Sequence, residues 1–224
     1  MSSRARAPRL YLITDRQATG GRPLPEVVAA ALRGIRGLAS GDVAVQLREK
    51  DLEGGALAAM ARALRSVTAD AGAALYINDR IDVALAVGAD GVHLGGGSLD
   101  AVTAAGIAGD LAIGVSVHGP AEVAALRAAA GDRVAFAQLG PIHDTPSKRR
   151  YGAPLGIAAI TEASRAGIPI VAVGGINPGN VRALRAAGAH GVACIRAAMT
   201  ASDPAAVVTA FCQELSDFRK MDSV

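Results

Sequence analysis

Short apolar runs alternate with longer stretches of helical periodicity along the whole chain. The apolar runs are rich in β-branched residues and occupy residues 10–14, 43–47, 75–78, 91–94, 112–117, 134–139, 170–173 and 192–195. The intervening segments repeat apolar residues at helical spacing, as in Leu57, Met60, Ala61 and Leu64. Several runs are apolar at nearly every position, which is typical of parallel strands packed on both faces.

Eight such strand–helix units in 224 residues predict an α/β fold, a single (β/α)8 TIM barrel of eight parallel strands with outer helices. The chain is 51% hydrophobic and 19% charged, which is sufficient to bury one large core. We expect residues 1–8 to form a flexible N-terminus, 9–218 the barrel and 219–224 a C-terminal tail.

Composition argues against several classes of protein. Aromatic residues make up 3% of the chain and Trp is absent, so base-stacking platforms for nucleic acid are not expected. The net charge is only +3, with the basic residues dispersed. The longest apolar run near the N-terminus falls far short of the roughly 20 residues that a membrane helix needs. Cys194 and Cys212 lie in apolar contexts, which is typical of buried cysteines in a reducing compartment, so we expect a cytoplasmic protein. From the composition and charge, we expect neither nucleic-acid nor membrane partners.

The barrel prediction gives the polar positions a meaning, because the carboxyl ends of barrel strands and the loops after them form the active face. Polar residues gather at these ends. They are Gln46, Arg48 and Lys50 after the second strand, Asn78 and Asp79 after the third, Ser116 and His118 at the fifth, and Thr145, Ser147 and Lys148 in the long loop after the sixth.

Two loops indicate a phosphate site. Gly174 and Gly175 end the seventh strand, and paired glycines let backbone N–H groups approach an oxyanion. Arg196 and Ala197 begin a helix after the eighth strand, and these two loops commonly hold phosphate in such barrels. The alternative is two tight turns without a ligand.

Three further groups carry candidate chemistry. Gln46, Arg48 and Lys50 alternate so that all three face one side, an arrangement that favours binding of an anion over a solvated charge run. Asp79 is interpreted either as a helix cap or as a ligand of Mg²⁺. His118 is the histidine best placed for proton transfer, with a structural role as the alternative.

Together these residues resemble the thiamine-biosynthetic barrel family that holds thiamine-phosphate synthase and the TenI-like thiazole tautomerase. The matching segments are QLREK at 46–50, INDRIDVALA at 77–86, GADGVHLG at 88–95, GVSVH at 114–118, LGPIHDTPSK at 139–148 and VAVGGINPGN at 171–180. They span most of the chain in the family's order. The resemblance implies a small phosphorylated thiazole as substrate, and a homo-oligomer is compatible with it.

The choice between branches depends on one position. Synthases of this family typically carry a Gly-Gln-x-Asp stretch whose Asp joins Asp79 in holding Mg²⁺, whereas here Ser98 stands at that place. A neutral hydroxyl is a poorer Mg²⁺ ligand than a carboxylate, and the Ser-Leu-Asp run is similar to the tautomerase branch. Asp100, two residues on, would need a shifted loop to substitute.

The leading hypothesis is therefore a thiazole tautomerase, an isomerase that needs no cofactor. It would convert a dihydrothiazole carboxylate phosphate to the aromatic thiazole carboxylate phosphate, with His118 moving the proton. Phosphate would lie at Gly174, Gly175, Arg196 and Ala197, and the substrate's carboxylate at Arg48 and Lys50.

Two alternatives stay open. The first is thiamine-phosphate synthase, a transferase that condenses hydroxymethylpyrimidine diphosphate with thiazole phosphate and releases diphosphate. There Asp79 would hold Mg²⁺, and Thr145, Ser147 and Lys148 the departing diphosphate. The second is a non-catalytic regulatory barrel that binds a phosphorylated ligand.

Overall fold

The strands close into a barrel in sequence order, each parallel to the next, with β8 returning to pair with β1. The computed structural model describes residues 6–145 and 153–221. The strands are β1 Leu10–Ile13, β2 Val43–Leu47, β3 Ala74–Asn78, β4 Gly91–Leu94, β5 Ala112–Val117, β6 Phe136–Leu139, β7 Ile170–Val173 and β8 Gly191–Cys194. The predicted TIM barrel is confirmed.

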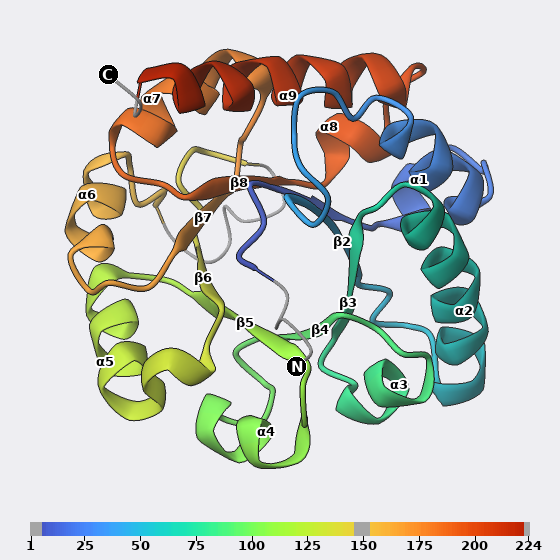
Figure 1. Ribbon diagram of the computed structural model, residues 1–224, viewed down its shortest axis with the longest axis horizontal. Coiled ribbons are helices and arrows are strands. Elements are labelled where there is room, and N and C mark those ends of the chain that lie inside the picture. The colour runs from blue at the N-terminus through green and yellow to red at the C-terminus, as the bar shows by residue number, and fades with distance from the viewer. Residues whose placement is uncertain (1–5, 146–152, 222–224) are drawn as a thin grey trace.

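Helices surround the ring of strands (Figure 1). They are α1 Leu24–Leu32, α2 Gly54–Asp70, α3 Ile81–Ala86, α4 Ala101–Ile107, α5 Pro120–Ala130, α6 Ala158–Ser164, α7 Val181–Ala186, α8 Arg196–Met199 and α9 Pro204–Met221, with 3-10 turns η1 Arg16–Ala18, η2 Gly131–Arg133 and η4 Pro178–Asn180. Helix α9 packs on α1 and α7 and continues past the boundary expected at residue 218. Within the described ranges, no helix combines the length and the apolar character of a membrane span.

The segment before β1 is held against the end of the barrel where the strands begin. Pro8 is buried, the backbone N–H of Arg9 donates to the Asp42 carbonyl at 2.7 Å, and the His190 ring contacts the Ala7 carbonyl at 2.9 Å. Figure 1 shows this N-terminal stretch crossing the centre of the ring. The backbone of Ala7 is thus tied to His190, directly before β8, and the Ala7 side chain packs against the apolar cluster inside the barrel.

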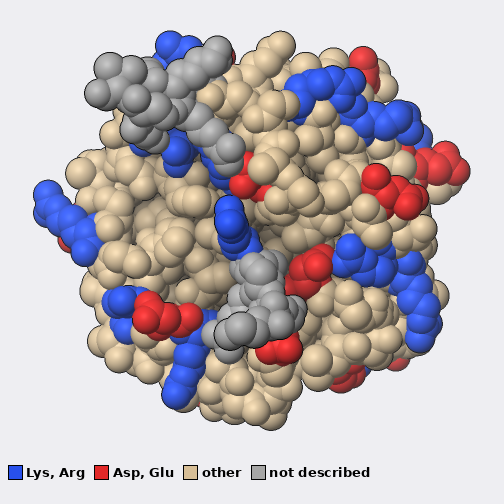
Figure 2. Space-filling view, in the orientation of Figure 1, with Lys and Arg blue, Asp and Glu red and all other residues tan. Residues whose placement is uncertain are grey.

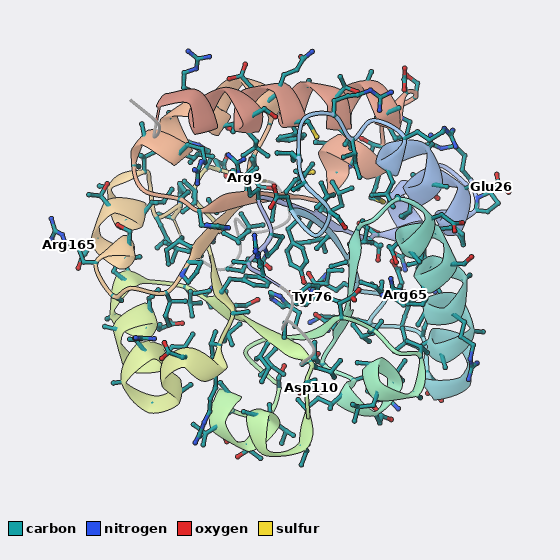
Figure 3. The ribbon with its side chains drawn as sticks, in the orientation of Figure 1. Arg9, Glu26, Arg65, Tyr76, Asp110 and Arg165 are labelled. Carbon is teal, nitrogen blue, oxygen red and sulfur yellow. The ribbon has the colours of Figure 1, made fainter. Side chains whose placement is uncertain are left out.

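Aromatic side chains fill the barrel's interior. The rings of Tyr11, Tyr76 and Phe136 meet edge to face with centroids 5.3–5.6 Å apart. Tyr76 lies inside the ring of strands, whereas Glu26 and Arg165 project outwards from the helices (Figure 3). Gly91 makes room for this layer, since a Cβ there would stand 2.3 Å from Cε1 of Tyr76. Because this packed layer fills the barrel interior, a ligand can bind only at one of the two ends of the barrel.

A second apolar layer, of strand residues facing outwards and helix residues facing inwards, joins the barrel to its helices. Few charged side chains are buried among the described residues, and on the face shown in Figure 2 positive and negative groups intermix around the edge of the molecule. That distribution agrees with the modest net charge of +3.

Candidate active site

A cavity of about 580 Å³ opens at the carboxyl ends of the strands. Every predicted site residue that the structure describes lines this cavity: Gln46, Arg48, Lys50, Asn78, Asp79, Ser116, His118, Thr145, Gly174, Gly175, Arg196 and Ala197. Ser147 and Lys148, predicted to bind substrate from the loop after β6, lie outside the described residues. The fold thus brings residues from six different strand ends to one chamber.

A larger cavity of about 910 Å³ lies at the opposite end, where the strands begin. Arg65 and Asp110 flank it, and Figure 3 labels both. Arg65 is paired with Asp90 at 2.5 Å, and the Asp90 carboxylate also accepts from the backbone N–H of Leu75 at 2.7 Å. These charges serve the packing of the barrel end, so we assign function to the smaller cavity, on the active face of the fold.

Asp79 is the centre of a hydrogen-bonded chain across the strand ends. The Gln46 amide donates to Asn78 Oδ1 at 3.0 Å, and the Asn78 amide donates to Asp79 Oδ2 at 2.7 Å. The Ser98 hydroxyl donates to the other carboxylate oxygen. Asp79 also has a φ of 62°, in the left-handed region that non-glycine residues rarely adopt. A residue with a strained backbone and a carboxylate held on both oxygens is typical of a functional position.

Asp100 is committed to a different role. Its carboxylate caps α4, where Oδ1 accepts from the backbone N–H groups of Val102 at 3.0 Å and Thr103 at 2.9 Å. The Thr103 hydroxyl donates to Oδ2 at 2.6 Å, and these bonds hold the pKa of Asp100 below its usual range. Asp100 is therefore a helix cap and not a substitute for the missing second carboxylate.

Glu49 positions the cationic wall formed by Arg48 and Lys50. It is buried between the ends of β1 and β2, where it accepts from the Thr14 hydroxyl at 2.7 Å and from the Arg16 backbone N–H at 3.1 Å. Burial raises the pKa of Glu49, and these hydrogen bonds oppose that rise. The Thr14 hydroxyl in turn accepts from the backbone N–H of Arg48 at 2.9 Å. The strand end that bears the cations is thus fixed by internal bonds.

The floor of the cavity includes two residues that the sequence argument did not propose for the site, His93 and Gln138. His93 is buried, with Nε2 2.9 Å from the Ser116 hydroxyl and Nδ1 3.3 Å from the Tyr11 hydroxyl. Burial lowers the pKa of His93 to about 3, so its ring is neutral at physiological pH. Strand parity accounts for both residues once the folded chain gives the inward phase, since His93 and Gln138 lie two positions after the inward-facing Gly91 and Phe136.

His118 stands exposed at the mouth. Its Nδ1 lies 2.9 Å from the Gly140 carbonyl, and a carbonyl only accepts, so Nδ1 carries a proton and donates this hydrogen bond. The backbone N–H of His118 donates to Glu122 at 2.9 Å. His118 is thereby linked to the start of the loop after β6.

Gly174 and Gly175 pack against that same loop. Both have positive φ, 99° and 66°, and a Cβ on Gly175 would stand 2.7 Å from Cβ of His143. The Gly174 carbonyl accepts from the backbone N–H of His143 at 3.1 Å. Asn177 caps the following turn, where its side-chain oxygen accepts from the backbone N–H of Gly179 at 3.0 Å. The glycines therefore allow two loops to meet at the rim of the cavity.

Comparison with known proteins identifies the family. The family model described as thiamine monophosphate synthase (TMP-TENI) matches residues 10–198. The chain belongs to this family. A thiamine-phosphate synthase of Roseiflexus castenholzii is 43% identical over 205 residues, 91% of this chain and 86% of that protein. One from Moorella thermoacetica is 43% identical over 200 residues, 88% of this chain and 90% of that protein.

Among solved structures, the thiamine phosphate pyrophosphorylase from Pyrococcus furiosus superimposes with a TM-score of 0.80 at 32% identity. The match covers 93% of this chain and 96% of that one. The sequence and structure comparisons therefore agree on the family.

The tautomerase hypothesis, with its isomerase activity, is wrong, because these family members are named for the synthase reaction. The tautomerase was favoured because Ser98 stands in place of a carboxylate. In the structure, Ser98 lies against Asp79 as a hydrogen-bond donor. Mg²⁺ often binds proteins through only one or two carboxylates and completes its shell with water and substrate phosphates, so a single Asp does not exclude a synthase.

The donor set fits Mg²⁺ on those terms. The Asp79 carboxylate lines the cavity and the Ser98 hydroxyl is bonded to it, so the two side chains supply neighbouring hard oxygen atoms. Over the parts of the chain that the structure describes, no group of three or more His, Cys, Asp or Glu side chains could enclose a metal ion. The remaining ligands would come from substrate and water.

Proposed function

We propose that this chain is a thiamine-phosphate synthase. It joins hydroxymethylpyrimidine diphosphate to thiazole phosphate. The bond between the pyrimidine's methylene carbon and the diphosphate oxygen breaks, the thiazole nitrogen forms a new bond to that carbon, and diphosphate leaves with the electron pair. The observation that carries the proposal is one cavity that holds the Asp79 carboxylate together with cations from separate loops, Arg48, Lys50 and Arg196.

The cations bind and orient the two phosphorylated substrates. Arg48 and Lys50, at the end of β2, would hold the diphosphate, together with Thr145, Ser147 and Lys148 of the loop after β6. Positive groups that face the leaving diphosphate stabilise the charge that develops as the bond breaks. Asp79 and Ser98 would hold Mg²⁺, which when bound supplies further neutralisation of the diphosphate.

The rim at β7 and β8 suits the thiazole phosphate. Gly174 and Gly175 allow backbone N–H groups to approach the phosphate oxygens, and Arg196 and Ala197 add the first turn of α8. The floor, with Gln46, Asn78 and Ser116, would bind the pyrimidine. The two reacting atoms would meet between floor and rim, and this positioning removes much of the entropic barrier.

His118 has a positioning role in this reaction. The proton transfer expected of it belonged to the tautomerase chemistry, and the synthase reaction needs no base at that point. Its bond to the Gly140 carbonyl fixes the start of the loop that bears Thr145, Ser147 and Lys148.

Substitution of Asp79 tests the proposal. Asp79→Asn removes the charge but suits the left-handed backbone, since Asn tolerates positive φ better than most residues. We expect Mg²⁺-dependent formation of thiamine phosphate to fall by about a hundredfold or more, the order of loss seen when a charge-stabilising group is removed.

The matched control is Asp82→Asn. Asp82 is exposed in the same segment, pairs with Arg80 and does not line the cavity, so its variant should keep the wild-type rate. Wild-type turnover by Asp79→Asn at saturating Mg²⁺ would contradict the proposed role of the carboxylate.

A further inference from the structure

Gln138 presents an unpaired hydrogen-bond acceptor to the cavity. It lies on β6, two residues after the inward-facing Phe136, so it projects into the barrel. Gln138 is 7% exposed and lines the cavity. The buried oxygen Oε1 has no hydrogen-bond partner among the residues that the structure describes.

The surroundings explain why the protein leaves this oxygen unpaired. Phe136 fills the layer of the barrel beneath it. On the neighbouring strand, the hydroxyl of Ser116, which is in register with Gln138, bonds to Nε2 of His93. A buried acceptor without a donor costs free energy unless a ligand or water supplies one.

Gln46, on the far side of the barrel, shows the same feature. Its amide nitrogen is used by Asn78, and its oxygen is buried without a partner in the described chain. The floor therefore offers two acceptors, a pattern that selects a ligand with N–H donors and not an anion.

Only one of the two proposed substrates carries such donors. The hydroxyl groups of both are esterified, and the thiazole ring has no N–H, whereas the pyrimidine has an exocyclic amine with two. We propose that the Gln138 amide oxygen accepts a hydrogen bond from this amine and makes Gln138 a specificity-determining residue for the aminopyrimidine. This inference rests on the proposed synthase function and names a residue that binds one substrate of that reaction.

The test measures discrimination between two substrates. Wild type and Gln138→Met are assayed with the aminopyrimidine diphosphate and with an analogue in which hydrogen replaces the amine. Wild type should prefer the amine by about tenfold or more in kcat/KM, since the analogue leaves the acceptor unpaired. Gln138→Met should lose most of that preference, with the KM for thiazole phosphate unchanged.

Two further variants keep the result interpretable. Gln213→Met makes the same change at an exposed position of α9 and should retain the wild-type preference. Gln138→Ala replaces Gln138→Met if the latter does not give a wild-type circular dichroism spectrum. An unchanged preference in the folded Gln138 variant, or a defect confined to the KM for thiazole phosphate, would overturn the inference.

Failure of the proposed function gives a different result. If wild type forms no thiamine phosphate, the synthase assignment fails. Calorimetric titration of wild type and Gln138→Met with the free aminopyrimidine and its deaminated analogue then decides the inference. Tighter binding of the amine by wild type alone supports it, and equal binding by both proteins contradicts it.

Discussion

Burial of His93 shows how one residue sets a property of the site. The ring lies between the Tyr11 and Ser116 hydroxyls in the barrel interior, where a charged imidazolium would lose its hydration. Neutral imidazole keeps the cavity floor uncharged beneath a cationic rim. The Arg and Lys side chains that line the cavity can then act on the substrates' phosphates without a competing positive charge at the floor.

This burial predicts how the stability of the protein depends on pH. The pKa of His93 falls from 6.5 in the unfolded chain to about 3 in the folded one, so the unfolded state binds more protons between these values. The contribution of His93 to the free energy of unfolding is therefore fully present above pH 6.5 and is lost as the pH falls below that value. Between pH 7 and 5 the loss from His93 should be about 2 kcal/mol.

Urea unfolding of wild type and His93→Asn at pH 7 and pH 5 measures this effect. The variant is less stable at pH 7 but should lose less of its stability on acidification. Burial also lowers the pKa of His190, so part of the acid sensitivity should remain in the variant. Equal losses in the two proteins would mean that His93 is not held neutral.

At the scale of elements, the loop after β7 connects the phosphate rim to the loop after β6. Gly175→Ala should weaken this connection, because the new Cβ would stand 2.7 Å from Cβ of His143. We expect the KM for thiazole phosphate to rise about tenfold, because the shifted loop would misplace the groups that bind the phosphate by a distance on the order of 1 Å.

Gly167→Ala separates this contact from backbone strain. Gly167 has a φ of 75°, close to the 66° of Gly175, but a Cβ there meets nothing within 4 Å. Both variants should lose about 1–2 kcal/mol of stability from the left-handed conformation. Thermal unfolding measures that shared cost, and steady-state kinetics the KM. A similar KM in both variants would show that the loop contact does not shape the phosphate site.

Element boundaries followed from the sequence because parallel strands in a barrel are short, apolar and separated by helical periodicity. Strands β2, β4, β5 and β7 begin and end where predicted. Strand β6 begins at Phe136 and not at residue 134, since the apolar residues before it belong to the connection from η2. The residue missed on that strand, Gln138, shows the limit of the method. Strands that are apolar on both faces offer little alternation from which to read the inward phase.

At the scale of the whole molecule, the barrel brings separate strand ends into one chamber, which is why residues chosen for their place after a strand line the same cavity. The reaction was harder to predict, because it depended on the partner of a single carboxylate. Ser98 and Asp79 come from different loops, and only the folded chain shows that the hydroxyl lies on the carboxylate.

The central claim is that this barrel joins two phosphorylated heterocycles with loss of diphosphate. The most direct measurement follows wild-type protein by ³¹P NMR with hydroxymethylpyrimidine diphosphate, thiazole phosphate and Mg²⁺. We expect diphosphate and thiamine phosphate to appear in equal amounts at a rate on the order of 0.1–10 per second. Omission of either substrate, or addition of EDTA, should stop the reaction. No thiamine phosphate from well-folded protein, or unchanged turnover in EDTA, would contradict the account.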